Sequence, residues 1–281
     1  MNATEKPSWV ENFDVVDMSK PEGPKALIGA LEAGISVSLV KDITDLDTAI
    51  IIKDTVTINL NNHTLSTIVD KTQTDTDGAS KHFYAIDNKG NLTIENGTIE
   101  TRGIYNREGA TLTIKENVTI KALDAGGGAC INVKGGTVNI DGAKLITNAG
   151  DFADTNTGWN PLKYEPSVVV VYDGVVNIKN ATLESTQSGA YALNVMGGKV
   201  TVENSTITAW RGVVYSANGS EVILNGGTYK FKVLVDGTWY GNWGTIEDTT
   251  TATSSVGWEM DETAGDCTLE ATGGVYTFTY N

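Results

Sequence analysis

The chain carries a short alternating pattern of apolar and polar residues that recurs along most of its length. Each copy has apolar residues at every second position, then Asn or Gly, any residue, usually Thr, and a final apolar residue. Alternation with a period of two is typical of a strand with one buried face. The seven copies read INLNNHTL (58–65), LTIENGTI (92–99), LTIKENVTI (112–120), VNIDGAKL (138–145), VNIKNATL (176–183), VTVENSTI (200–207) and VILNGGTY (222–229).

The Asn or Gly in each copy predicts a sharp corner between two strands. These residue types tolerate the left-handed backbone conformation that strains other residues. The predicted corner residues are Asn62, Asn96, Asn117, Gly142, Asn180, Asn204 and Gly226. We expect the corner Asn amides to form hydrogen bonds with the turns above and below.

The spacing of the copies predicts a solenoid. The first apolar residues of successive copies lie 20 to 38 residues apart, and the longer steps equal a unit of twenty-odd residues plus an insertion. The leucine-rich signature is missing, and a propeller blade needs about twice this length. We therefore expect stacked turns whose strands pair in parallel and in register. One inner row is predicted to contain Ile94, Ile114, Ile140, Ile178, Val202 and Leu224.

The two ends of the chain differ from the repeat. Residues 1–23 predict an extended arm, and PKALIGALEA predicts a short amphipathic helix over 24–33 that Gly34 terminates and that covers the first turn. After Tyr229 the repeat fades, and residues 230–281 contain DG and GG turns between strand-like segments. We interpret this last part as a small antiparallel β cap.

The repeats, the strand-plus-turn segments IDNKG, INVKGG and NVMGG, and the N-terminal helix resemble the right-handed parallel β-helix of the pectate-lyase-like superfamily over residues 24–229. The resemblance implies an all-β solenoid. It says little about function, because this architecture serves polysaccharide lyases, glycoside hydrolases, bacterial surface proteins and bacteriophage fibres.

Charge and cysteine content narrow the function classes. With 20 basic and 35 acidic side chains, the net charge is −15, which argues against binding a nucleic-acid backbone or an anionic membrane. The N-terminus shows no signal peptide, and no segment is long and apolar enough to span a bilayer. Cys130 and Cys267 are too few for a disulfide framework or a metal cluster, and we expect Cys130 to be buried. The sequence predicts no cofactor and no metal.

Three insertions, at 69–82, 121–129 and 149–166, follow the strand after the corner, so we expect neighbouring loops on one side of the rod. Candidate sugar- or receptor-binding residues are the acids and aromatics of the last insertion and three aromatics of the C-terminal part. They are Asp151, Phe152, Asp154, Trp159, Tyr164, Trp239, Tyr240 and Trp243. The alternative is that these loops are solvent-exposed segments or protein contact surface without a ligand, and that the C-terminal aromatics form an apolar lid that closes the solenoid.

Catalysis is a further alternative, because paired carboxylates hydrolyse glycosidic bonds and clustered acids hold Ca²⁺ in lyases. The Asp-Asp and Gly-His-Gly elements of polygalacturonase-like hydrolases are missing, and neither His63 nor His82 has a recognisable partner. We assign no catalytic residue. A carbohydrate-active enzyme that acts outside the cell stays the alternative to a non-enzymatic protein.

Within this fold, the missing export and catalytic signals favour a structural protein of a bacteriophage virion, such as a head fibre, capsid decoration or tail-fibre component. Its partners would be other virion proteins and host cell-surface polysaccharide, and trimers are common among phage β-helices of this kind. Trp9, Val10 and Phe13 of the arm are the candidate anchor to the particle. A bacterial surface adhesin, located at the cell surface, is a second alternative.

Overall fold

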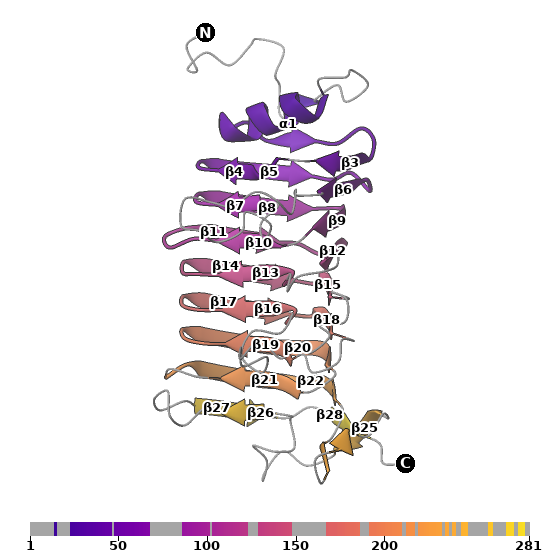
Figure 1. Ribbon diagram of the computed structural model, residues 1–281, viewed down its shortest axis with the longest axis vertical. Coiled ribbons are helices and arrows are strands. Elements are labelled where there is room, and N and C mark those ends of the chain that lie inside the picture. Colours follow the sequence, from indigo (N-terminus) through magenta and orange to yellow (C-terminus); the bar gives the residue numbers. More distant parts are fainter. Residues whose placement is uncertain are drawn as a thin grey trace.

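The structure, a computed structural model, arranges the repeats as a rod of stacked strands (Figure 1). The described residues are 14–15, 23–46, 48–67, 86–101, 103–122, 129–147, 167–185, 191–209, 212–216, 219–231, 234–235, 238–239, 243–246, 258–260, 268–272 and 275–278. Each turn contributes one strand to each of three faces, and all pairings between successive turns are parallel.

Face 1 is an eight-stranded sheet with one strand from each turn. Its strands are β4 (Ile50–Ile52), β7 (Ile86–Asn88), β10 (Ile104–Asn106), β13 (Ile131–Val133), β16 (Val169–Val171), β19 (Tyr191–Val195), β21 (Gly212–Ser216) and β26 (Trp258–Met260). Seven steps between eight strands give a rod roughly 35 Å long.

Faces 2 and 3 belong to one continuous sheet, because β20 (Lys199–Ala209) and β22 (Glu221–Phe231) run through the corner between them. Face 2 also contains β2 (Val37–Ser38), β5 (Thr55–Asn59), β8 (Asn91–Glu95), β11 (Thr111–Ile114), β14 (Thr137–Asp141), β17 (Val175–Lys179) and β27 (Thr268–Thr272). Face 3 contains β3 (Ile43–Leu46), β6 (Thr64–Thr67), β9 (Gly97–Thr101), β12 (Val118–Ala122), β15 (Lys144–Thr147), β18 (Thr182–Ser185) and β28 (Val275–Phe278).

The predicted inner row is confirmed on face 2. Its members are aligned Cα partners in successive strands, with Ile58 preceding Ile94 at the start of the row. All of them are at most 1% exposed. This row is one of the aliphatic ladders that fill the interior of the rod, so alternation in the sequence did identify the buried side of the strand.

The seven predicted corners also have the expected backbone. Their φ angles lie between 46° at Asn204 and 69° at Gly142. Two corner amides reach the previous turn as predicted: Asn180 Nδ2 donates to Asp141 Oδ1 (3.0 Å) and Asn96 Nδ2 donates to Asn59 Oδ1 (3.4 Å). The acceptors are residues just before the neighbouring corner, so these bonds do not run from one corner Asn to the next.

Helix α1 (Gly23–Glu32) covers the N-terminal end of the rod, one residue earlier than predicted (Figure 1). Leu27 and Leu31 are fully buried and join the main core. Gly34, with φ of 76°, lies just past the helix as expected of a terminator. Within the arm, β1 (Asp14–Val15) pairs in parallel with β2.

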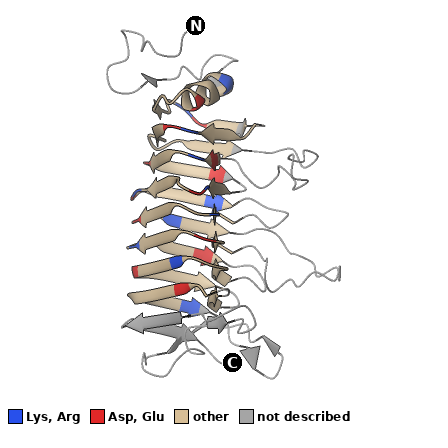
Figure 2. Ribbon diagram, turned by 90° about the vertical axis from the view of Figure 1, so that its left-hand side faces the viewer, with Lys and Arg blue, Asp and Glu red and all other residues tan. Residues whose placement is uncertain are grey.

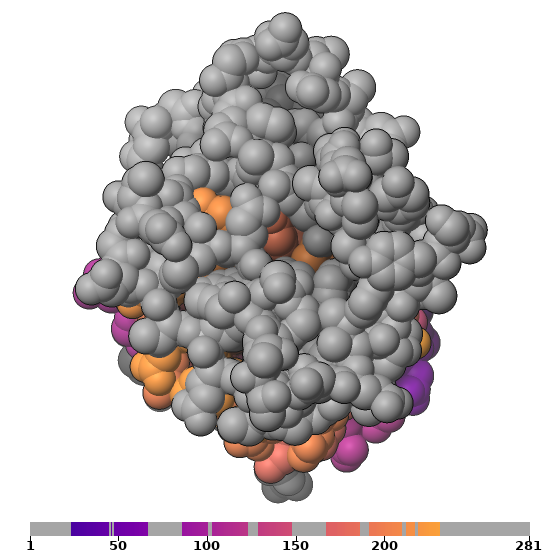
Figure 3. Space-filling view, turned by 90° about the horizontal axis from the view of Figure 1, so that it is seen from below, coloured from indigo at the N-terminus to yellow at the C-terminus, as the bar shows by residue number. Residues whose placement is uncertain are grey.

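The C-terminal part contains the predicted antiparallel pairs, but it also continues the solenoid. β23 (Leu234–Val235) pairs with β24 (Thr238–Trp239), and β25 (Trp243–Ile246) pairs with β28, both antiparallel. In contrast, β26, β27 and β28 each pair in parallel with the preceding turn. The prediction of a purely antiparallel cap was therefore incomplete, because residues 258–278 contribute an eighth turn. Figure 3 shows this end along the axis, with the described atoms of the last turns in orange.

Candidate functional site

The long connections all join face 3 to face 1. The chain leaves face 3 at the ends of β6, β12 and β15 and returns at the starts of β7, β13 and β16. β12 and β15 are adjacent in register, as are β13 and β16, which the pairs Ala122–Thr147 and Ile131–Val169 show. One strand separates β6 from β12 and β7 from β13 in the same stacks. The three insertions therefore start and end along one corner of the rod, in agreement with the prediction of loops on one side.

The candidate binding residues predicted from those loops lie outside the described residues. This applies to Asp151, Phe152, Asp154, Trp159, Tyr164 and Tyr240, and also to the candidate anchor residues Trp9, Val10 and Phe13. Trp239 and Trp243 lie in β24 and β25, where the backbone alone is described. The described side chains that form clusters on the outside of the rod lie above all on face 1.

The outer surface of face 1 is unusual because parts of it are buried. β10, β19 and β21 are buried at every position, whereas β13 and β16 alternate. Tyr105 (4% exposed) and Tyr215 (3%) occupy the outward row that also contains Asp87. Aromatic side chains thus shield the outside of this sheet, whereas the outward residues of β5, β8, β11 and β14 on face 2 are polar.

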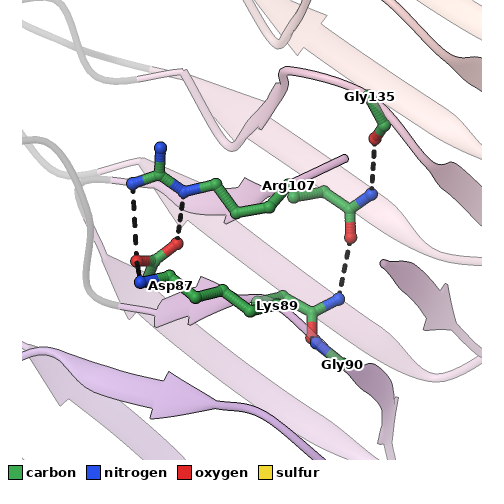
Figure 4. Close-up of polar contacts among 7 residues, drawn as sticks. Asp87, Lys89, Gly90, Arg107 and Gly135 are labelled. Atoms are coloured by element: carbon green, nitrogen blue, oxygen red, sulfur yellow. Dashed lines mark hydrogen bonds and ion pairs between the residues drawn. The ribbon is translucent and has the colours of Figure 1, made fainter. Parts of the chain in front are cut away.

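Asp87, Arg107 and Lys89 form an ion-pair cluster across two turns (Figure 4). Arg107 donates through Nε to Asp87 Oδ1 (2.7 Å) and through Nη2 to Oδ2 (3.4 Å), while Lys89 Nζ lies 3.2 Å from Oδ2. The Asp87 side chain is 13% exposed. A bidentate contact between a guanidinium and a carboxylate is among the stronger polar contacts in proteins. This contact fixes the Arg107 side chain in place.

Two cations on this surface rest on tyrosine rings. The Arg107 guanidinium carbon lies 4.1 Å from the centre of the Tyr105 ring, and Lys134 Nζ lies 3.3 Å from the centre of the Tyr172 ring. Partial burial, with a smaller contribution from the Arg107 charge, lowers the pKa of Lys134 below its ordinary value. We refer to Asp87, Tyr105, Arg107, Lys134 and Tyr172 as the tyrosine–cation stripe.

A buried pair of asparagines supports the stripe from inside the rod. Asn88 and Asn106 are fully buried, and Asn88 Nδ2 donates to Asn106 Oδ1 at 2.7 Å. Asn106 Nδ2 in turn donates to the Gly135 carbonyl at 2.9 Å, one turn further on (Figure 4). Stacked asparagine contacts were predicted at the Asn/Gly corners of the repeat. This direct side-chain pair lies instead at the turn from face 1 to face 2, where it holds the backbone that carries Arg107 and Lys134.

A small aromatic cluster lies further along the same face. Tyr191 and Tyr215 have ring centres 5.6 Å apart and are both nearly buried, with Met196 packed against them. This cluster is separate from the main core. Face 1 therefore has an apolar part near its C-terminal end and a charged part in the middle.

The stripe could have been found in the sequence. The segments IDNKG, IYNREG, INVKGG, VVVYDG and NVMGG share a position just after the three-residue strand, occupied by Lys89, Arg107, Lys134, Tyr172 and Met196. Backbone hydrogen bonds link each of these residues to the turn before. The alternation of apolar and polar residues that marks the core does not include this position and therefore did not reveal the stripe.

Cys130 and His63 are two other residues with sequence-based expectations. Cys130 is buried as predicted, and burial raises the pKa of its thiol to about 12. His63, in contrast, does have a partner: its Nδ1 lies 3.2 Å from Asp42 Oδ1. The sequence could not reveal this pair, because Asp42 precedes the first copy of the repeat. The hydrogen bond from the Thr64 backbone N–H makes the largest contribution to lowering the pKa of Asp42, and His63 makes a smaller one.

Among the described residues, no three His, Cys, Asp or Glu side chains are grouped so that they could hold a metal ion. None of the helices in this part of the chain is long and apolar enough to cross a membrane. Comparison with protein-family models, curated proteins and solved structures found no match to this chain.

Proposed function

We propose that this protein is a non-enzymatic structural component of a bacteriophage particle, such as a head fibre, capsid decoration or tail-fibre component. In this role the β-helix is a stiff spacer, the N-terminal arm attaches it to the particle, and its sides contact glycans of the host surface. Other virion proteins are the expected partners of the arm.

The observation that carries the proposal is the arrangement of ion pairs along the surface of the rod. Six ion pairs join side chains of adjacent turns, and they occur on all three faces. They are Arg107–Asp87, Lys115–Glu95, Lys121–Glu100, Lys144–Glu184, Lys179–Glu203 and Lys199–Glu221. Each exposed pair contributes only about 0–1 kcal/mol. Repeated along the axis, however, they oppose sliding or bending of one turn over the next, which is a property of a spacer.

The arm supports the same role. β1 adds Asp14 and Val15 to the edge of β2, next to the capping helix. The candidate anchor residues Trp9, Val10 and Phe13 precede this strand in the sequence. A segment that begins beside the covered end of the rod is well placed to join the rod to a larger body.

Attachment is tested with two truncations. Removing residues 1–13 deletes the anchor residues and keeps β1, whereas removing 1–23 also deletes the strand that covers the edge of β2. We expect both variants to be missing from purified particles, as measured by mass spectrometry, and the shorter deletion to melt like the full chain. Normal incorporation of the 1–13 deletion, or absence of the full-length protein from particles, would refute the proposal.

A carbohydrate-active enzyme is the second candidate, favoured by the tyrosine–cation stripe. A lysine with a lowered pKa beside an arginine suits proton abstraction next to a sugar carboxylate. If the protein is a lyase, polyuronates will yield unsaturated products that absorb in the ultraviolet. Lys134→Met would abolish this activity, and Lys121→Met, which removes a lysine paired with Glu100 on face 3, would keep it.

A further inference from the structure

The outer surface of face 2 carries a regular array of uncharged polar side chains. Five successive strands, β5, β8, β11, β14 and β17, each present two outward residues at matching register. We call this array the Thr/Asn grid. Its rows are Thr55 and Thr57, Asn91 and Thr93, Thr111 and Thr113, Thr137 and Asn139, and Val175 and Asn177.

The grid is uncharged in a protein of net charge −15. The nearest ionised column lies to one side, where Glu95 pairs with Lys115 and Lys179 pairs with Glu203. Figure 2 shows where the charged positions fall along the ribbon of the rod. The grid consists of six threonines, three asparagines and one valine. It therefore offers hydroxyl and amide groups and carries no charge.

Much of the hydrogen-bonding capacity of the grid is unused. Asn91 Nδ2 donates to Thr55 Oγ1 (3.1 Å), and Asn177 Nδ2 donates to Asn139 Oδ1 (2.9 Å), so these side chains are aligned along the rod. Within the described part of the chain, the hydroxyls of Thr57, Thr93 and Thr113 make no hydrogen bond. They are half-buried, fixed by the sheet and available to a ligand.

The size of the grid argues against a second copy of the chain as its occupant. Five rungs spaced by about 4.8 Å and two columns about 7 Å apart cover on the order of 200 Å². A stable protein interface needs roughly 800 Å² on each partner. A narrow, extended and uncharged molecule fits these dimensions better than a protein does.

We propose that the Thr/Asn grid binds an extended, neutral, β-linked polysaccharide chain that lies along the rod. Such a chain advances by about the length of one sugar ring per unit, which is close to the rise from one strand to the next, so each rung can contact one sugar. Threonine hydroxyls and asparagine amides both donate to and accept from sugar hydroxyls, while the threonine methyl groups contact the apolar C–H surface. The proposal rests on the proposed function, of which it specifies the glycan contact.

The test compares two double substitutions of the full chain in the same two turns. Thr93→Lys with Thr113→Lys puts two charges into the grid, on β8 and β11. Thr98→Lys with Thr119→Lys does the same on face 3, on the neighbouring strands β9 and β12. All four threonines are half-buried and outward, so the two variants have matched effects on folding.

Binding is measured by depletion of the protein from solution onto cellulose, chitin and mannan particles, with soluble polygalacturonate as an anionic comparison. We expect the unaltered protein to bind at least one neutral polymer and to bind polygalacturonate weakly. The grid variant should lose at least tenfold in affinity and the face 3 variant less than twofold. Thr93→Ala with Thr113→Ala, which removes hydroxyls without adding charge, should give an intermediate loss.

Three outcomes would overturn the inference: no binding to any neutral polymer, an equal loss in both lysine variants, or binding abolished by Lys134→Met on face 1 with the grid variant unaffected. A change of sedimentation behaviour in the grid variant alone would instead identify a contact between copies and would also contradict it. Because binding is measured on the isolated protein and incorporation on particles, failure of the glycan contact is distinguishable from failure of the structural role.

Discussion

At the scale of single residues, the inner row of face 2 tolerates no charge. Ile178 is 1% exposed and lies between Ile140 and Val202 in adjacent strands. Ile178→Asp would place an unpaired carboxylate in an aliphatic column, which costs at least about 3 kcal/mol. We expect a much lower midpoint in chemical unfolding, or loss of soluble protein.

The neighbouring residue provides the control for this prediction. Asn177 is exposed on the opposite side of the same strand, so Asn177→Asp should change the free energy of unfolding by less than about 1 kcal/mol. If Ile178→Asp unfolds cooperatively at the midpoint of the unaltered protein, the inner row is not where the structure places it.

Cys130 gives a prediction about pH. Its thiol has a pKa raised from 9.0 to about 12, because burial penalises the thiolate. The folded state therefore keeps this proton when the unfolded state has lost it, so the contribution to stability is complete below pH 9 and is lost as pH rises toward 12. In a Cys267→Ser background, a thiol reagent at pH 8 should modify Cys130 only upon unfolding.

The Cys267→Ser background also serves to compare the protein with and without the Cys130 thiol. Replacing Cys130 by Ser should remove the decline in unfolding free energy that the thiol causes between pH 9 and 12, while other groups continue to titrate. Rapid modification of the folded protein at pH 8 would show that the thiol is accessible.

At the scale of the element, the turns from face 1 to face 2 depend on glycines that lie against the turn before, among them Gly136. Gly136 has φ of 70°, and a Cβ there would lie 2.1 Å from the carbonyl oxygen of Ala110 in the turn before. Gly109 has a similar φ of 74° but open space around it. Gly109→Ala should therefore cost about 1–2 kcal/mol, from backbone strain alone.

Gly136→Ala adds a clash with the backbone of the neighbouring turn to the same strain, and we expect at least twice that cost. The two variants are compared by the free energy of unfolding in denaturant. Equal losses would mean that the turns do not approach each other as closely as the structure indicates.

The sequence predicted the elements whose signal repeats and missed those whose signal is interrupted. Alternation identified the inner row, and Asn or Gly identified seven corners between face 2 and face 3, because both follow from local backbone and burial requirements. The eighth turn was missed although LEATGGVY (269–276) aligns with VILNGGTY (222–229) in the sheet. Ala271 replaces the larger aliphatic residue of the other copies, and the step doubles to 47 residues.

The outward surfaces were harder to predict for a different reason. Arg107 and Lys134 share a position just after their strands, but they lie 27 positions apart in sequence, and the register is needed to place them side by side. The same is true of Thr57 and Thr93, whose separation includes an insertion. A polar residue in a strand says that its side chain faces outward, whereas its neighbours on that surface depend on how many residues each connection contains.

At the scale of the whole molecule, the last turn protects the sheet edges of the rod. β26, β27 and β28 pair with β21 and β22, whose backbone groups would otherwise form open edges. A chain that ends at residue 229 should therefore self-associate, because unpaired parallel edges recruit other strands. Sedimentation analysis should show aggregates of the shortened chain at concentrations where the full chain does not aggregate.

An additional substitution tests the cause of this association. Ile223 lies on the outward side of β22, so Ile223→Lys in the shortened chain should reduce aggregation by placing a charge at the new edge. A shortened chain that stays as soluble as the full protein would show that the eighth turn has no protective role.

The connections between faces differ in how much length they tolerate. Between face 1 and face 2, two to four residues separate the strands in the first seven turns, as in 89–90 and 107–110. Between face 3 and face 1, the connections that precede β22 range from two residues (102–103) to 21 (148–168), yet the strands on either side keep their register. Mutation can therefore lengthen, shorten or exchange segments at this single corner without disturbing the core. A foreign peptide grafted between β9 and β10 would be displayed at a fixed height on the rod.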